Sequence, residues 1–464
     1  MFIEDTNRRV VITGMGATSA LGSTLEELWR AARDGICAVR STTENETYPT
    51  THVAPIDSFQ GKIQDFGELD DSKKKAIRKG IKLMSREIQL GVASAQRAIA
   101  DASLDGQYPS ARVGVSFASD YIVTTPQELI DAIAACRKES EDGEEVFDGS
   151  HWRENGLSKM TPLWQLKYLT NMVASHITIY NEFLGPAFDM TNREASFSAA
   201  LGDAAETIKS GRADAMIVGA TGSRVHPYRI IEAIKNGEIA PEIVKGVGTG
   251  GDGVSRPFDA RRTGAIPGEG AGAVALETLE AAQKRGAKIY AEVCGGVYRG
   301  VFKRAKDCPS AAVNPTETPR DLALTAEGAR EAIRLTLARL VEKCGVSLDS
   351  IGHISANARG DVALDSAEAL ALRDVFGAKL DDIPVCALKG ATGNPGAGGG
   401  AIETIASVLA LQNGTLYPTL GYETPDPNCP VAPVRESGIL AGDSFIKICA
   451  NSLGQASAAL IRKL

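Results

Sequence analysis

Short apolar runs alternate along the chain with longer segments in which apolar residues recur at helical spacing. The strand-like runs are residues 8–16, 112–119, 215–221, 272–279 and 288–298. Amphipathic helices are predicted at 25–35 and 325–345, and further alternating segments follow at 351–358, 383–390, 401–411 and 445–454. Strands alternating with helices predict an α/β fold, and two similar rounds of the pattern indicate an internal duplication.

Two segments depart from this alternation. Residues 120–160 are rich in charge and contain the run ESEDGEE, so we expect an insertion at the surface. Residues 71–104 are interpreted as one long helix, basic in its first half and apolar in its second. The basic side chains are Lys73, Lys74, Lys75, Arg78, Lys79, Lys82 and Arg86. They form either a solvated helix face or a docking surface for an acidic partner.

Composition narrows the classes of function. The net charge of −8 argues against general affinity for nucleic acid. The chain contains no stretch of about 18 apolar residues, and no membrane span is expected. Its first 16 residues lack the apolar core of a signal peptide. The eight cysteines show no C-x-x-C spacing, so we expect a reduced cytoplasmic protein without a metal site, a disulfide framework or a cofactor.

The segment TNREASFSAALGDAAETIKSGRADAMIVGA (191–220) predicts a loop, a helix and then a buried strand. Small residues crowd the start of that helix, which suits close packing against another backbone. Glu194 stands at the corner between loop and helix, where an acyl-transfer enzyme would have its nucleophile.

Six blocks of the chain carry a family resemblance. They are VVITGMGATSALG (10–22), NMVASHITIYNEFLGPA (171–187), ALGDAAETIKSGRADAMIVGA (200–220), SRPFDARRTGAIPGEGAGAVALETLEAAQKRGAKIYAEV (255–293), LKGATGNPGAGGGAIETIASVLAL (388–411) and ANSLGQASA (450–458). In this order they resemble the β-ketoacyl-acyl carrier protein synthases, the elongating condensing enzymes of the thiolase fold. The resemblance implies a duplicated αβαβα five-layer sandwich with halves at 1–277 and 278–464. It also implies a homodimer or a heterodimer of homologues.

The resemblance implies a catalytic cysteine at a helix N-terminus and two histidines that stabilise the enolate and the oxyanion. Counting from the shared blocks puts Glu194 at the cysteine position, Asn357 at the first histidine and Asn394 at the second. A shift of one or two residues would instead bring Ala358 or Arg359 to the first histidine position. All three catalytic side chains are therefore changed.

Other family positions are kept or altered. Lys389 matches the family lysine and Glu403 the family glutamate, and we expect Lys389 to form an ion pair with Glu194. The gating loop reads Leu453-Gly454-Gln455-Ala456, so its phenylalanine gate is absent.

These changes leave two hypotheses. An acyl-glutamate would be a mixed anhydride that water destroys, and asparagine cannot carry a proton at neutral pH. The first hypothesis is a partner protein without condensing activity, similar to chain-length factors, that binds an acyl chain, acyl carrier protein and an intact ketosynthase. The alternative is an enzyme on carrier-bound acyl thioesters that uses Glu194 as base or stabiliser. Loss of the cysteine and both histidines favours the partner, with the basic helix as the carrier docking surface.

Overall fold

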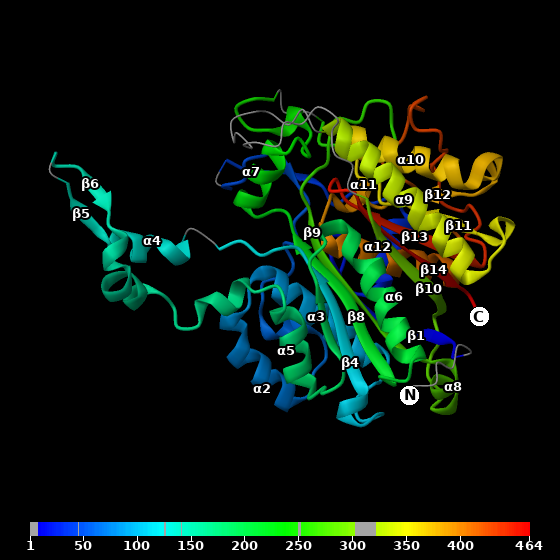
Figure 1. Ribbon diagram of the computed structural model, residues 1–464, viewed down its shortest axis with the longest axis horizontal. Helices are drawn as coiled ribbons and strands as arrows, with labels where there is room; N and C mark the ends of the chain where they lie inside the picture. Colours follow the sequence, from blue (N-terminus) through cyan, green and yellow to red (C-terminus); the bar gives the residue numbers. More distant parts are fainter. Residues whose placement is uncertain (1–7, 45, 125–126, 141, 249–251, 302–321) are drawn as a thin grey trace.

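The fold is built on one mixed sheet (Figure 1). The computed structural model describes residues 8–44, 46–124, 127–140, 142–248, 252–301 and 322–464. In the described residues the sheet has ten strands in the order β12-β11-β13-β14-β10-β1-β9-β8-β4-β7. They are β1 Val10–Ser19, β4 Val113–Ser119, β7 Ala187–Met190, β8 Ala215–Ser223, β9 Glu269–Thr278, β10 Ala291–Gly300, β11 His353–Ser355, β12 Val385–Cys386, β13 Ser444–Ala450 and β14 Gln455–Arg462.

Both halves of this sheet have the same topology. From the centre of the sheet outward, the first half runs β1, β9, β8, β4, β7 and the second half runs β10, β14, β13, β11, β12. Numbered along the chain, both halves have the spatial order one, five, four, two, three. The first three strands in that spatial order are antiparallel neighbours, and the last three are parallel neighbours. The halves join where Val10–Ile12 of β1 pairs with Ala291–Val293 of β10. The predicted duplication is therefore confirmed, and we propose a boundary at 277–278, at the end of β9.

The two halves of the sheet are the two β layers of the sandwich, and helices form the other three layers. They are α1 Leu25–Arg33, α2 Asp71–Gly80, α3 Arg86–Asp101, α4 Gln127–Ala134, α5 Met172–Asn181, α6 Ser196–Lys209, α7 Pro227–Lys235, α8 Leu279–Lys284, α9 Leu322–Cys344, α10 Val362–Phe376, α11 Lys389–Thr392 and α12 Ala397–Asn413. α6 and α12 pack on each other and on strands of both halves, α3 packs on β1, β8 and β9, and α9 packs on β10, β14 and α10. α6 and α12 thus form the central layer of the sandwich (Figure 1).

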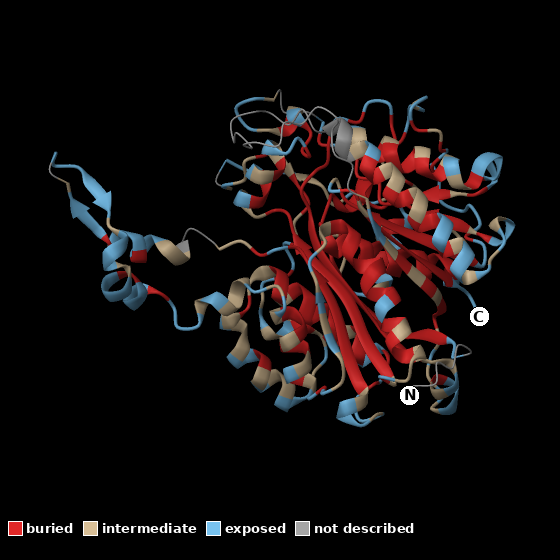
Figure 2. Cartoon of the chain, viewed as in Figure 1, coloured by how far each residue is buried: buried red, intermediate tan, exposed pale blue. Residues whose placement is uncertain are grey.

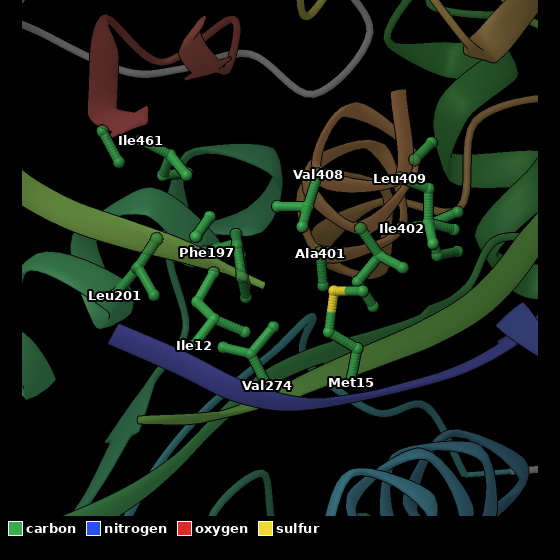
Figure 3. Packing of buried hydrophobic residues seen from close by; sticks show 14 of the residues in the cluster. Ile12, Met15, Phe197, Leu201, Val274, Ala401, Ile402, Val408, Leu409 and Ile461 are labelled. Atoms are coloured by element: carbon green, nitrogen blue, oxygen red, sulfur yellow. The ribbon is translucent and has the colours of Figure 1, made fainter. Parts of the chain in front are cut away.

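Apolar side chains fill the space around the central helices. Figure 3 shows Ala401 and Ile402 of α12 facing Met15 of β1 and Val274 of β9. The predicted strand at 215–221 forms the buried β8 between β4 and β9, as expected for an interior strand.

Glycines bring the central helices against the sheet, as the small residues at the start of the helix after Glu194 predict. A Cβ on Gly202 of α6 would come within 2.9 Å of Gly296 in β10. A Cβ on Gly398 of α12 would come within 2.0 Å of the Gly270 carbonyl oxygen in β9. Any larger side chain at these positions would push the helices away from the strands and from the corner that carries Glu194.

The prediction of one long helix at 71–104 is wrong. α2 ends at Gly80, a short 3₁₀ turn follows, and α3 starts at Arg86. Ser85 has extended backbone and caps α3 by accepting a hydrogen bond from the Ile88 amide at 3.4 Å. A serine that caps a new helix competes with continuation of the preceding one.

The charged insertion is an arm that stands away from the rest of the fold (Figure 1). It carries α4 and a hairpin of β5 Arg137–Glu139 and β6 Glu145–Phe147. Its surface is largely exposed, in contrast to the buried sheet (Figure 2). Asp120, which the sequence assigned to this surface segment, is instead buried at 2% exposure at the end of β4. None of the described helices is long and apolar enough to cross a membrane.

Candidate functional site

Glu194 lies at the corner where the chain enters α6. A single 3₁₀ turn, Arg193–Ala195, precedes the helix, and Arg193 has a positive φ of 51° that non-glycine residues rarely adopt. This turn places the Glu194 side chain inside the molecule, where it is 2% exposed. Its position at a helix N-terminus favours a negative charge.

Three side chains donate to one oxygen of Glu194. Its Oε1 accepts hydrogen bonds from Arg359 Nη1 at 2.8 Å, from Arg224 Nη2 at 3.1 Å and from Asn394 Nδ2 at 3.1 Å. Burial alone would raise the pKa of Glu194, but the charges of Arg224, Arg359 and Arg193 hold that pKa well below its usual range. Glu194 is therefore an anion at neutral pH and a poor proton acceptor.

Three further buried charges extend this group. Arg224 Nε donates to Asp120 at 2.7 Å, and Arg229 Nη2 donates to the same carboxylate at 3.3 Å. Glu238 lies 3.5 Å from Arg224 Nη1 and 3.6 Å from Arg359 Nη1. We call these six residues the arginine–carboxylate cluster: Asp120, Glu194, Arg224, Arg229, Glu238 and Arg359. Each of these buried charges has a partner of opposite sign, and Arg193, Glu232 and Asp361 pair with the cluster at its margin.

The sheet topology explains how Asp120 meets Arg224. β4 and β8 are parallel neighbours, with Ser119 beside Thr221, so the residues that follow them lie at the same edge of the sheet. Asp120 directly follows the predicted strand 112–119 and Arg224 comes three residues after the predicted strand 215–221, and a charged residue near the end of a buried strand is the feature that could have indicated the cluster. Without the pairing of the strands, nothing in the sequence joins residues 104 positions apart.

Asn394 is held by the glycine-rich loop before α12. Its Oδ1 accepts a hydrogen bond from the Gly396 amide at 3.1 Å, which turns its Nδ2 toward Glu194. Gly396 has a φ of 65°, and a Cβ there would come within 2.1 Å of Asp120 Oδ2. Glu194 and Asn394, which the family count assigns to the cysteine and the second histidine, thus have their side chains in direct contact.

Lys389 and Glu403 belong to a second buried cluster. Lys389 Nζ lies 2.7 Å from Glu403 Oε1, and Lys447 pairs with the other oxygen of that carboxylate. The expected ion pair between Lys389 and Glu194 is therefore wrong. Lys389 also donates to the Asn357 carbonyl oxygen at 2.9 Å. In the described part of the chain, no hydrogen bond connects this cluster to the arginine–carboxylate cluster.

Among the described residues, no hydrogen bond joins Asn357 to Glu194. Its Nδ2 donates to the Ala450 carbonyl oxygen at 3.0 Å, and its amide donates to Glu368 at 2.7 Å. Burial raises the pKa of Glu368 to about 7. The residue of this loop that reaches Glu194 is Arg359, two positions further on. Asn357 stays the residue that the count without gaps assigns to the first histidine position, and Arg359, the residue of the two-residue shift, is the one that contacts Glu194.

The histidines lie outside the arginine–carboxylate cluster, and the gating loop lies near the segment before Glu194. None of the five histidines hydrogen-bonds a member of the arginine–carboxylate cluster in the described residues. His353 is buried against Phe445, and burial lowers its pKa to about 4. Leu453 of the gating loop is exposed, and Asn451, two residues before the loop, donates to the Asn192 carbonyl oxygen at 2.9 Å and to Gln455 Oε1 of the loop at 2.8 Å. Asn451 thus connects the gating loop to the segment that leads into Glu194.

The basic side chains of α2 and α3 differ in their partners. Arg86 pairs with buried Glu269 at 2.7 Å, and Lys73 pairs with Asp105 at 2.7 Å. Lys74 lies 3.7 Å from Asp71, the distance of a weak pair. Among the basic side chains of residues 73–86, those that are exposed and form no ion pair within the described residues are Lys75, Arg78 and Lys79 of α2 and Lys82 of the turn that follows it. These four residues form what we call the α2 face.

Comparison with known proteins gives a consistent result. The family model for the beta-ketoacyl synthase N-terminal domain matches residues 7–282, and the model for the C-terminal domain matches residues 311–423. The 3-oxoacyl-[acyl-carrier-protein] synthase, mitochondrial, of Arabidopsis thaliana is 28% identical over 438 residues, covering 91% of this chain and 85% of the relative. The 3-oxoacyl-[acyl-carrier-protein] synthase 2 of Staphylococcus aureus (strain COL) is 27% identical over 430 residues, covering 91% and 90%.

Solved structures share the fold. A type II PKS acyl-carrier protein in complex with its ketosynthase bound to the hexaketide matches with a TM-score of 0.76 at 22% identity, covering 98% of this chain and 99% of that chain. The ishigamide ketosynthase/chain length factor matches with a TM-score of 0.75 at 22% identity, covering 98% and 99%. With family models over most of its length and thiolase-fold ketosynthases as structural neighbours, the chain belongs to the beta-ketoacyl synthase family.

Proposed function

We propose that this chain is a non-condensing ketosynthase-like subunit that binds acyl carrier protein and assembles with a second chain of the same family. The observation that carries the proposal is the buried, hydrogen-bonded Glu194 carboxylate, which the count from the family blocks assigns to the position of the family nucleophile. Arg359 and Arg224 keep it ionised and hydrogen-bonded. A carboxylate held in this way is a weak nucleophile, and its acyl product would be an unstable anhydride.

The cluster also bears on the expected acyl ligand. The surroundings of Glu194 consist of buried charged groups, and an alkyl chain placed among them would separate ions without supplying new partners. We propose that an acyl chain on this subunit lies away from Glu194. The scaffold then acts through its surfaces rather than through chemistry at the corner of α6.

The alternative is an enzyme that uses Glu194 as a base on carrier-bound thioesters. A general base works best when its pKa lies near the operating pH. Arg224, Arg359 and Arg193 hold the pKa of Glu194 well below that range, against the effect of burial. The geometry therefore favours the non-condensing subunit over the altered enzyme.

Assembly is part of the proposal. β7 ends the sheet and pairs only with β4 among the described strands, so its outer edge offers unpaired backbone groups to another chain. A second copy or an intact ketosynthase fits this edge equally well, because both carry the same fold. The relatives that share the fold include a ketosynthase solved with its acyl-carrier protein.

The first test is intact-mass spectrometry of the purified protein with acyl-carrier and malonyl-carrier substrates. We expect no acyl adduct and no β-ketoacyl product from the wild type alone, because Glu194 offers no stable acceptor. An intact condensing enzyme is the positive control. Condensation or decarboxylation by the wild type, abolished in Glu194→Ala, would establish Glu194 as a catalytic group and overturn the proposal.

The second test addresses carrier docking. Reversing Lys74 and Lys75 to glutamate is expected to slow association with the acidic carrier, most strongly at low salt, since exposed charges are screened over about 8–10 Å at physiological ionic strength. Association rates measured by stopped flow at two salt concentrations would show the effect. Lys284→Glu, an exposed position on α8, is the matched control. Equal rates in all variants would assign the basic residues to a solvated helix face.

A further inference from the structure

The helix α7 begins with a histidine cap. His226 is its N-cap residue, and the ring Nδ1 of His226 accepts a hydrogen bond from the Tyr228 amide at 3.2 Å. Pro227 lies between them and has no amide hydrogen, so Tyr228 carries the first amide hydrogen within the helix. The common cap residues are serine, threonine, asparagine and aspartate, whose oxygen atoms stay acceptors throughout the neutral pH range. A histidine nitrogen accepts only while it is unprotonated, so the cap of α7 depends on pH.

The surroundings of His226 favour the neutral ring. Its side chain is half-buried, and burial lowers the pKa of His226, with a further contribution from the charge of Arg229 in the same helix. Within the described residues no carboxylate offsets that charge. The buried side chains packed together at this end of α7 are apolar and come from Val53, Val225 and Ile230. Tyr48 packs on the same group and stays neutral, because burial raises the pKa of its phenol.

Protonation of His226 would remove the cap and add repulsion at the same place. An imidazolium ring is a donor at both nitrogens, so Nδ1 would face the Tyr228 amide hydrogen with no acceptor between them. A positive charge at a helix N-terminus also opposes the helix dipole. Arg229, three residues into the chain from His226, would repel the new charge. All three effects destabilise the first turn of α7 as the pH falls.

This first turn of α7 holds one side of the arginine–carboxylate cluster. Arg229 donates to Asp120 through Nη2 at 3.3 Å and to Glu232 through Nη1 at 2.8 Å. Glu232 also pairs with Arg193 at 3.6 Å, at the turn that leads into α6. The Tyr121 ring covers Arg229, whose guanidinium carbon lies 3.9 Å from the ring centre. Because α7 lies on the outside of the fold (Figure 1), loss of its first turn leaves the central layer in place.

We propose that His226 is a pH-sensitive cap, whose protonation below about pH 6.5 releases the first turn of α7 from the arginine–carboxylate cluster. Because the fold lowers the pKa of His226, its contribution to stability is present above the unfolded value of about 6.5 and is lost as the pH falls through the folded pKa. Release separates Arg229 from Asp120 and gives water access to these buried charges. The switch depends neither on carrier binding nor on assembly, so it can be tested on the isolated chain.

Hydrogen–deuterium exchange of peptides that cover α7 measures the opening. Between about pH 7.5 and about pH 5.5, the protection factor of α7 in the wild type is expected to fall by about fivefold, as for the loss of a typical N-cap. His226→Asn supplies an acceptor that does not titrate, so its protection factor should change little with pH. His226→Ala lacks the acceptor and should show low protection at both values.

Two references separate local opening from a change in global stability. The helix α1 is capped by Thr24 and Glu27, and the pKa of Glu27 is lowered by hydrogen bonds from Ser23 and Thr24, so its cap stays intact over this range. Protection of α1 should therefore not follow that of α7. His151→Asn, at an exposed histidine of the arm, is the matched control and should keep the wild-type response of α7.

Nuclear magnetic resonance of the chain labelled with nitrogen-15 histidine gives a second readout. The neutral ring of His226 is expected to carry its proton on Nε2, because Nδ1 accepts the Tyr228 amide, and to titrate with a pKa below about 6.5. The proposal is overturned by equal pH responses of wild type and His226→Asn, by unchanged protection of α7 in His226→Ala at the higher pH, or by a neutral ring protonated at Nδ1.

Discussion

Replacing Glu194 by glutamine is expected to lower the free energy of unfolding by about 3–5 kcal/mol, the usual cost of removing one partner from a buried ion pair. The two side chains have nearly the same size, so packing is kept. The amide leaves Arg359 and Arg224 facing a neutral group in a site that is 2% exposed. Equilibrium unfolding in urea measures the change. Glu436→Gln, at an exposed position, is the matched control and is expected to have no effect beyond about 0.5 kcal/mol.

The pH dependence identifies the charge as the cause. Because the fold lowers the pKa of Glu194, its contribution to stability is present above the unfolded value of about 4.3 and is lost as pH falls below it. The difference in stability between wild type and Glu194→Gln should therefore shrink as the pH is lowered from about 4 toward the folded pKa. A difference that stays constant with pH, or a cost below about 1 kcal/mol, would show that the cluster does not depend on the Glu194 charge.

The sequence predicted the layers of the fold because they depend on local pattern. Apolar runs such as 215–221 and amphipathic segments such as 325–345 carry their periodicity within about 20 residues. The pattern predicts one helix over 71–104 and misses the break at Ser85, because the basic and the apolar segment both have helical spacing. Serine is a strong N-cap and could have indicated the break. The order of the strands depends on contacts distant in sequence and could not be derived from these runs.

Only those parts of the candidate site that depend on nearby sequence could be predicted. Glu194 and Asn394 were placed by counting from nearby family blocks, and the structure brings them into contact. Lys389 was assigned to the wrong carboxylate, because Glu403 competes for it and already accepts a second lysine. Asp120 and Arg224 were missed since only the parallel pairing of β4 and β8 brings them together.

The assignment of the first histidine position leads to the prediction with the largest change in activity. The triple variant Glu194→Cys/Arg359→His/Asn394→His is expected to decarboxylate malonyl-carrier at least about 100-fold faster than Glu194→Cys/Asn357→His/Asn394→His, in keeping with the usual contribution of a positioned acid–base group. The reason is geometric. Arg359 and Asn394 both reach the Glu194 carboxylate, whereas Asn357 is bonded to Ala450 and Lys389. We therefore expect a histidine at 359 to lie nearer the thiol than one at 357.

The two triple variants control for each other, because both carry the new cysteine, the histidine at 394 and the same loss of the Glu194 charge. Carbon dioxide release and intact-mass detection of the acyl adduct report decarboxylation and acylation separately, and thermal unfolding checks that each variant is folded. Acylation without decarboxylation in the 357 variant, together with both steps in the 359 variant, is the expected pattern. Equal decarboxylation in the two folded variants, or a faster rate in the 357 variant, would return the histidine position to Asn357. It would also mean that the contact between Arg359 and Glu194 does not mark the place where the family's chemistry occurs.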